Sequence, residues 1–251
     1  QFRQAYELRG TEHSAFTDSA EDTAVRQSIV EFDTRMLAES RAIFTESQNV
    51  ANRLKQYNGL DGKALYHPPQ YWSRHYHAAY GDYILSVGRL VPLKRVDLLL
   101  RALARPGVNG RAVIVGEGPE RANLEALAAQ LGIQQRVEFA GAQWGQELVD
   151  LYANARGVYY APYDEDYGLV TPEAFRSHKP VITTHDAGGT LEFVFDDETG
   201  YVTAPEPDAV AGAVSRLMAD EATCARLGDA GRDSVEFISW DYVIDNLLGA
   251  A

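Results

Sequence analysis

The stretch YILSVGRLVPLKRVDLLLRALA, residues 83–104, determines the fold prediction. It opens with a mostly apolar run typical of a buried strand, turns at Gly88, and continues with the apolar spacing of a helix, which we expect from Pro92 to Ala104. The same unit recurs in AVIVGEGP, residues 112–119, where a continuous apolar run again enters a glycine turn. Strands covered on both faces are apolar throughout, so these two units predict a parallel sheet.

The alternation of strands and helices extends along most of the chain. We expect further strands near 137–139, 157–161 and 180–183, and helices near 119–131, 146–154, 171–177 and from 208 onward. Right-handed crossovers place helices on both faces of such a sheet, and ligands bind at the carboxyl ends of its strands. The predicted fold class is therefore α/β, with a doubly wound, Rossmann-like parallel sheet over residues 81–238.

The remainder of the chain has a weaker pattern. Residues 1–23 predict a loop, and a helix near 23–40 is expected to bury one apolar stripe. Its members are Val25, Ile29, Phe32, Met36 and Leu37. The pattern then predicts a strand at 42–45, a helix that Ser47 caps and Asn58-Gly59 ends, and a strand at 63–66. We interpret 1–68 as a small α/β remnant of an N-terminal domain, 69–80 as a proline-containing linker, and 239–251 as a C-terminal crossover helix.

Composition restricts the classes of function. The formal net charge is -13, from 23 Lys and Arg against 36 Asp and Glu, which argues against nucleic-acid binding. Cys224 is the one cysteine, so no intrachain disulfide is possible and a reducing cytoplasm is the expected location. No apolar run approaches the roughly 18 residues of a membrane span. No cluster of His, Cys or Asp predicts a metal site.

The turn from Gly88 to Lys94 is the first candidate site. Gly88 lets a ligand approach the backbone, Arg89 can bind two phosphate oxygens at once, and Lys94 adds a mobile positive charge. The helix that follows offers free N–H groups and the positive end of its dipole. These residues predict a diphosphate site. The alternative is that Arg89 and Lys94 are solvated charges beside an ordinary turn.

The turn Gly116-Glu117-Gly118-Pro119 is the second candidate. Its two glycines allow the backbone to reach a ligand, with Pro119 in the first turn of the next helix. The alternative, that these glycines only close a tight turn, is favoured from the residues alone. The turn is not a complete GxGxxG, which argues against a dinucleotide-dependent dehydrogenase.

The third candidate is the segment from Glu165 to Glu173, which follows a strand and spans the start of a helix that Thr171 or a neighbour caps. Three consecutive residues, Gly168, Leu169 and Val170, can offer unpaired N–H groups to phosphate. Glu173 can accept hydrogen bonds from a ribose diol, and Glu165 then faces a sugar. Acids are also favoured at helix N-termini without any ligand, but this does not explain the glycine between them.

A fourth loop, Asp186 to Glu192, contains paired glycines that suit either a ligand or a tight turn. Together the loops give the order Gly-Arg-Leu-x3-Lys, Gly-Glu-Gly-Pro, Val-Glu-Phe-x-Gly (137–141), Glu-x7-Glu and Gly-Gly-x-x-Glu. This order resembles the C-terminal, donor-binding domain of family 4 retaining glycosyltransferases of the GT-B fold (group 1 glycosyltransferases). The resemblance covers residues 80–238, and the glutamate pair is its most specific element.

The resemblance implies a role for each matched position. Arg89 and Lys94, with the backbone at Gly88, Gly118 and residues 168–170, would bind the diphosphate of a UDP- or GDP-sugar. Glu165 would position the sugar and stabilise charge rather than act as a nucleophile, and Glu173 would hold the ribose. The residues Val137 and Phe139 would lie near the base. The implied reaction is transfer of a sugar, with retention and without a metal ion or other cofactor, to a saccharide or lipid-linked acceptor, as in polysaccharide biosynthesis.

The sequence departs from the family at its front, because most of the acceptor domain has no counterpart. Either the sequence is part of a longer chain, or a homodimer or partner subunit supplies the acceptor half. The terminal helix could form the dimer contacts or pack on residues 24–57. A lipid acceptor would bring the protein to the inner face of the membrane as a peripheral enzyme. The alternative functions are a non-catalytic nucleotide-sugar-binding subunit and, less favoured, a sugar-nucleotide epimerase.

Overall fold

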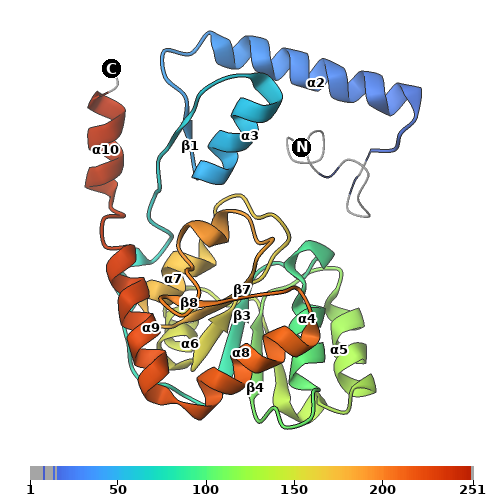
Figure 1. Cartoon of the computed structure of the whole chain (residues 1–251), viewed down its shortest axis with the longest axis vertical. Helices are drawn as coiled ribbons and strands as arrows, with labels where there is room; N and C mark the ends of the chain where they lie inside the picture. Colours follow the sequence, from blue (N-terminus) through green and yellow to red (C-terminus); the bar gives the residue numbers. More distant parts are fainter. Residues whose placement is uncertain (1–7, 9–13, 15, 250–251) are drawn as a thin grey trace. The chain divides into compact units, whose positions relative to one another are not determined.

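Six parallel strands form the main sheet, in the order β5-β4-β3-β6-β7-β8 (Figure 1). Their bounds are β3 (Tyr83–Val87), β4 (Arg111–Val115), β5 (Val137–Gly141), β6 (Gly157–Tyr159), β7 (Val181–Thr184) and β8 (Gly200–Thr203). The chain enters at β3, steps outward to β5, and returns to place β6 beside β3. This order confirms the predicted doubly wound α/β fold, and its topological switch point lies between β3 and β6.

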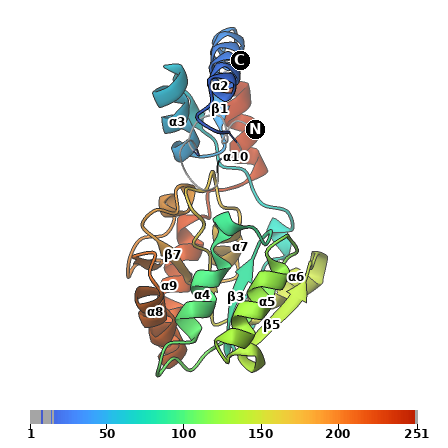
Figure 2. The ribbon, with the colours of Figure 1, turned by 90° about the vertical axis from the view of Figure 1, so that its right-hand side faces the viewer.

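Helices cover this sheet on both faces (Figure 2). They are α4 (Val96–Leu103), α5 (Arg121–Gln130), α6 (Gly145–Asn154), α7 (Val170–Arg176), α8 (Pro207–Ala219) and α9 (Glu221–Ser234). The main hydrophobic cluster joins Ile84, Ile114 and Ile182 of the strands to apolar residues of α4, α5 and α8. The residues next to these in sequence, such as Leu85 and Val113, are equally buried, and alternation along a strand turns them to the opposite face. Burial on both faces explains the continuous apolar runs of the sequence.

The structure corrects three of the expected elements. The helix expected from Pro92 to Ala104 is interrupted, because Pro92–Lys94 form a 3-10 turn and Arg95 takes a left-handed conformation with φ 48° before α4 begins. Strand β8 was not expected, since Tyr201 and Val202 give too short an apolar run to indicate a strand. Thr171 does not cap α7, because it lies inside that helix and is fully buried.

The computed structural model describes residues 8, 14 and 16–249 of the chain. The chain divides into two compact units. One unit, residues 68–239, contains the six-stranded sheet, and the other consists of residues 1–67 and 240–251. Most of the loop expected over 1–23 lies outside the described residues, as do 250 and 251 of the C-terminal segment. None of the helices in the described part is long and apolar enough to cross a membrane.

The smaller unit contains one strand-helix-strand step flanked by two helices. Its elements are α2 (Ala20–Ala38), β1 (Phe44–Thr45), α3 (Gln48–Asn58), β2 (Lys63–Ala64) and α10 (Trp240–Gly249). The predicted ends of α3 are confirmed, because Ser47 Oγ accepts a hydrogen bond of 3.1 Å from the Val50 N–H and Gly59 is left-handed with φ 69°. The two strands are parallel and shorter than the sequence predicts. Interpretation of this unit as the remnant of an acceptor domain stays a prediction.

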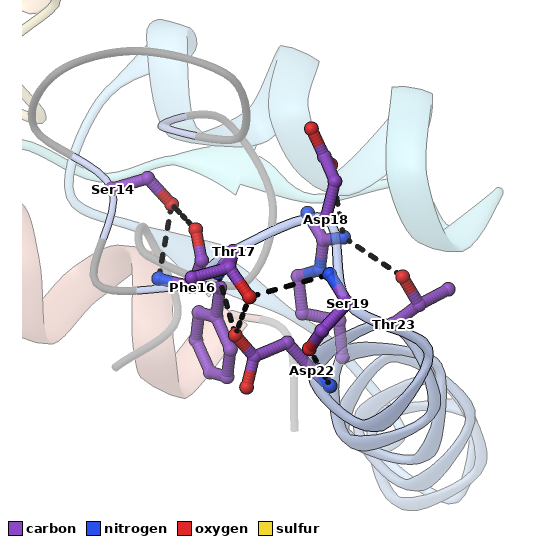
Figure 3. A network of polar contacts seen from close by, with 8 residues as sticks. Ser14, Phe16, Thr17, Asp18, Ser19, Asp22 and Thr23 are labelled. Atoms are coloured by element: carbon purple, nitrogen blue, oxygen red, sulfur yellow. Dashed lines mark hydrogen bonds and ion pairs between the residues drawn. The ribbon is translucent and has the colours of Figure 1, made fainter.

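Helix α2 begins three residues earlier than expected because of a local capping network (Figure 3). Ser19 Oγ accepts a hydrogen bond of 3.1 Å from the Asp22 N–H. The Asp22 carboxylate in turn accepts bonds from the hydroxyl and backbone N–H of Thr17 at 2.5 and 2.6 Å, which lower the pKa of Asp22. The first bond satisfies an N–H group in the first turn of the helix, and the other two hold the preceding Thr17 against that turn, so the helix begins at Ala20.

The apolar stripe expected to be buried along α2 is instead largely exposed. Val25, Phe32 and Met36 are exposed, and Arg26 is the buried residue of the helix. Helix α10 has a similar exposed row of Trp240, Ile244, Leu247 and Leu248, although Val243 is buried. The prediction of buried contacts for the α2 stripe was therefore wrong for the described residues, and the prediction that α10 forms dimer contacts stays a prediction.

Candidate functional site

The loops that follow β3 and β6 meet at the switch point of the sheet. Lys94, at the end of the first loop, donates a hydrogen bond of 2.9 Å to the Tyr160 hydroxyl and forms an ion pair with Glu165. The ammonium also lies 5.0 Å from the centre of the Tyr160 ring. Both charged side chains are largely shielded from solvent. The structure thus brings together two residues that the sequence placed in separate motifs 71 positions apart.

Arg95 fixes the relative position of these loops. Its guanidinium donates to both carboxylate oxygens of Asp186 and to Thr184 Oγ1, each at 2.8 Å. It also donates to the carbonyls of Ala161 and Pro162 at 2.8 and 2.9 Å. Burial raises the pKa of Asp186, but the hydrogen bonds from Arg95 and Thr184 outweigh it and leave the pKa lowered. This role of Arg95 is not predictable from the sequence, because a left-handed conformation at a helix start has no clear sequence signal.

Arg89 differs from its two basic neighbours because its side chain is exposed and makes no hydrogen bond or ion pair with any described residue. Its backbone N–H is also not a donor in the backbone hydrogen bonds of the described part of the chain. Arg89 follows Gly88 at the end of β3, with φ 151° at the glycine. A free guanidinium beside a free N–H group at a strand end is an arrangement suited to an anion.

The glycines of the first two loops have different surroundings. A Cβ on Gly88 would approach only the flexible end of Lys94, at 3.9 Å. A Cβ on Gly116 would come within 1.9 Å of the Gly88 carbonyl oxygen, and one on Gly118 within 2.2 Å of the Leu90 carbonyl oxygen. Hydrogen bonds between the two loops hold them at this distance. The structure thus assigns the second loop the tight packing given as its alternative, and leaves open space at Gly88.

The loop from Glu165 to Val170 presents a row of backbone donors. Gly168 is left-handed with φ 78°, and the N–H groups of Gly168, Leu169 and Val170 donate in none of the hydrogen bonds between described residues. The neighbouring loop supports this segment, because the Gly189 N–H donates to the Glu165 carbonyl at 2.8 Å. A Cβ on Gly189 would lie 2.1 Å from the Asp166 carbonyl oxygen, so this glycine serves loop packing.

Glu173 lies within α7, behind that row of donors. Tyr152 of α6 is fully buried, and its hydroxyl donates a hydrogen bond of 2.7 Å to Glu173 Oε2. Burial raises the pKa of Glu173 to about 7, although the bond from Tyr152 opposes the shift. A carboxyl group with this pKa changes its charge near neutral pH. Glu173 is predicted from the sequence as a site residue, whereas Tyr152 is not.

The positions predicted to lie near a nucleotide base are on a strand rather than in these loops. Val137 and Phe139 lie on the edge strand β5 and pack against the hydrophobic core. Their contact with a nucleotide base stays a prediction. Among the described residues no group of three or more His, Cys, Asp and Glu could hold a metal ion. The loops after β3 and β6 therefore contain the predicted cations, the predicted acid Glu165 and the free backbone donors.

Comparison with known proteins identifies the family. The sequence profile of the glycosyl transferases group 1 family matches residues 77–234, more than half of the chain and the part that contains all four loops. The chain belongs to the group 1 glycosyltransferases. The chain is 36% identical over 177 residues to the D-inositol 3-phosphate glycosyltransferase of Nocardia farcinica, covering 66% of the chain and 39% of the relative. The chain spans 37–42% of the length of the first curated relatives it matches.

Solved structures show the same fold. The Anabaena protein Alr3699/HepE in complex with UDP and glucose matches 90% of this chain and 68% of its own chain, with a TM-score of 0.79 and 21% identity. Sucrose-phosphate synthase from Thermosynechococcus elongatus matches 94% of this chain and 65% of its own, with a TM-score of 0.76 and 23% identity. These similarities agree with the predicted GT-B type of fold.

Proposed function

We propose that this glycosyltransferase binds a nucleotide diphosphate sugar at the β3–β6 edge of its sheet and transfers the sugar with retention of configuration. The observation that carries the proposal is that Arg89, Lys94 and the free N–H groups of residues 168–170 lie in the loops that follow the neighbouring strands β3 and β6, which the Lys94–Glu165 ion pair joins. The backbone N–H groups are held in place before any ligand arrives, and fixed dipoles stabilise a developing anion without reorganisation. A diphosphate leaving group develops negative charge as the glycosidic bond breaks.

The position of Lys94 supports a specific order in which the charged groups change partners when the donor binds. Without a ligand its ammonium is neutralised by Glu165. When a diphosphate is bound, Lys94 can turn to the phosphate oxygens, and the carboxylate of Glu165 is left facing the sugar, whose anomeric carbon becomes positively charged. The bond from this carbon to the phosphate oxygen breaks as an acceptor hydroxyl attacks from the same side and passes its proton to the phosphate. Glu165 forms no covalent bond in this scheme.

A solved structure of the same fold supports the proposed donor class. The Anabaena structure holds UDP and glucose, and UDP or GDP fits a site whose main recognition is of the diphosphate. We propose that Glu173 binds the ribose of this nucleotide and that the base lies near Val137 and Phe139 on β5. No cofactor or metal ion is part of the proposed chemistry. The acceptor is a saccharide or a lipid-linked sugar, and we propose that residues beyond this sheet, in the same protein, a homodimer or a partner subunit, bind it.

We propose a cytoplasmic location, at the inner membrane face where the acceptor is lipid-linked. A non-catalytic nucleotide-sugar-binding subunit is the second candidate function. It is less favoured because Arg89, Lys94, Glu165 and Glu173 are all present.

A transfer assay tests the proposal. The protein is incubated with UDP-glucose and GDP-mannose in turn, with glucose as a model acceptor, and released nucleoside diphosphate is measured. The anomeric configuration of the product is read by proton NMR. We expect release of one diphosphate, dependent on Glu165, and an α-linked product from an α-linked donor. A β-linked product would contradict retention, and tight donor binding with no release would favour the binding subunit.

A further inference from the structure

Tyr152 is the buried neighbour of Glu173 for which the sequence motifs give no role. Its hydroxyl donates to Glu173 Oε2 at 2.7 Å, and its side chain is fully shielded from solvent. We propose that Tyr152 is a positioning residue, which occupies one oxygen of the Glu173 carboxylate and directs the other to the nucleotide ribose. This inference rests on the proposed function, in which Glu173 accepts hydrogen bonds from the ribose diol.

The hydrogen-bonding capacity of the two groups supports this role. A phenol has one proton to donate, whereas an ionised carboxylate has two oxygens with about four acceptor sites. The bond from Tyr152 uses one of these sites and leaves Oε1 available for a hydroxyl donor. A vicinal diol can donate two hydrogen bonds, so it needs a carboxylate that is both ionised and correctly oriented. Tyr152 favours both conditions, since a hydrogen bond to the charged form stabilises that form.

The ring of Tyr152 also packs against a third segment of the chain, the one that precedes β3. His75, from the segment before β3, packs edge-on against it with ring centroids 5.3 Å apart. The Nδ1 atom of His75 lies 2.9 Å from Ser177 Oγ, just after α7. The segment at His75, helix α6 and helix α7 therefore form one buried contact around the Tyr152–Glu173 bond. The hydroxyl cannot move away from Glu173 without disturbing this packing.

The charged and titratable groups around this bond make a pH test interpretable. Burial, with a smaller effect from Arg176 of α7, lowers the pKa of His75 to about 4, so that it is neutral above pH 5 or so. Arg176 stays cationic in this range, and burial together with Glu173 raises the pKa of Tyr152. Tyr160, which follows β6, is the remaining titratable group that acts on Tyr152. Among these described groups Glu173 is the one whose charge changes near neutral pH.

Donor affinity should depend on pH through the charge of Glu173. Ribose binding needs the ionised carboxylate, so donor affinity falls as the pH drops through the pKa of Glu173. Replacing Tyr152 by Phe removes a hydrogen bond that lowers this pKa. The pKa then rises further, and the loss of affinity begins at a higher pH. A purely structural role of the tyrosine ring would not move this midpoint, because Phe keeps the ring.

The experiment is a calorimetric titration of UDP and GDP into the wild type and Tyr152→Phe at several pH values from about 6 to 9. Tyr83→Phe is the matched control, because the Tyr83 hydroxyl donates at 2.7 Å to the Leu151 carbonyl of helix α6 and makes no hydrogen bond to Glu173. For Tyr152→Phe we expect the midpoint of the affinity profile to rise by about 0.5 to 1 pH unit, with affinity weakened about fivefold near pH 7.5. The profile of Tyr83→Phe should match that of the wild type.

The outcomes separate this inference from the function on which it rests. No binding of either diphosphate by the wild type would overturn the proposed function and this role with it. Binding by the wild type with the same midpoint in Tyr152→Phe would overturn only the role of Tyr152. Glu173→Gln and Tyr152→Phe/Glu173→Gln extend the test if the single tyrosine variant does not fold. These two should bind UDP equally, and a further loss in the double variant would show that Tyr152 acts independently of Glu173.

Discussion

Lys94 and Glu165 form an ion pair across the switch point of the sheet, at the ends of strands β3 and β6. Each residue belongs to a different sequence motif, and each is the partner that neutralises the other when the site has no ligand. Tyr160 holds the ammonium from a second side with a hydrogen bond of 2.9 Å. A diphosphate must therefore compete with Glu165 for Lys94, and this competition gives the first prediction.

Replacing Glu165 by Gln should improve the binding of free diphosphate and impair transfer. The change releases Lys94 and removes a negative charge near the phosphates, and a partly buried pair of this kind corresponds to about 1 kcal/mol, or roughly fivefold in UDP affinity. The transfer rate should fall by about 100-fold or more, because the charge facing the sugar is lost. Calorimetry and the transfer assay measure the two effects. Glu125→Gln, which removes an exposed partner of Arg121 on α5, is the control and should change neither.

Two glycine substitutions should separate ligand approach from chain packing. In Gly88→Ala the new methyl group meets only the end of Lys94, so we expect a stability loss of about 1 to 2 kcal/mol from the unfavourable φ, but at least a tenfold loss of diphosphate affinity. In Gly118→Ala the methyl group collides with the Leu90 carbonyl, and the free energy of unfolding should fall by about 3 kcal/mol or more. Urea unfolding and calorimetry test the pair. Equal stability losses in the two variants would contradict this distinction.

Replacing Arg95 by Lys should loosen the loops around the site. The guanidinium makes five hydrogen bonds to Asp186, Thr184 and two carbonyls, which an ammonium with three donors cannot reproduce. We expect the free energy of unfolding in urea to fall by about 2 to 4 kcal/mol. Arg105→Lys, at an exposed ion pair with Asp208, is the matched control and should cost well under about 1 kcal/mol. A similar small loss of stability in both variants would show that Arg95 does not hold these loops together.

Glu173→Gln should make the protein more stable at alkaline pH while weakening donor binding. The folded pKa of Glu173 is about 7, raised from its ordinary value of 4.5, so its contribution to stability is present below pH 4.5 and lost as the pH rises through 7. The neutral amide mimics the protonated acid, and the variant should gain on the order of 2 kcal/mol near pH 8.5 and nothing near pH 4. Urea unfolding at both pH values measures this. A pH-independent difference between variant and wild type would contradict the raised pKa.

Much of the sheet could be predicted from the sequence because its strands are buried on both faces. Runs such as residues 112–115 have no polar residue, and the glycine turns after them mark the carboxyl edge. Strand β8 escaped prediction because its two apolar residues are too few to show a period. The exposure of the apolar stripe of α2 could not be predicted either, because apolar spacing shows that a helix face is apolar but not what covers it.

The site was predictable to the extent that its residues occur in glycine-rich loops. Arg89, Lys94, Glu165 and Glu173 all follow strands and could be placed at one edge. Their connections could not be predicted, because Tyr152 lies on a helix face where its apolar spacing looks like core packing. The left-handed conformation of Arg95 likewise depends on hydrogen bonds to residues about 90 positions away.

The most direct test of the central claim is calorimetric titration of UDP, GDP and ADP into the wild type and into an Arg89→Ala/Lys94→Ala variant. The control for the change in net charge is Arg101→Ala/Arg105→Ala, which removes two exposed arginines, one in the last turn of α4 and one just after that helix. We predict that the wild type and the control bind UDP or GDP with the same affinity and that the Arg89→Ala/Lys94→Ala variant loses this binding. Undiminished binding by the Arg89→Ala/Lys94→Ala variant would contradict the assignment of the diphosphate site to the loop after β3.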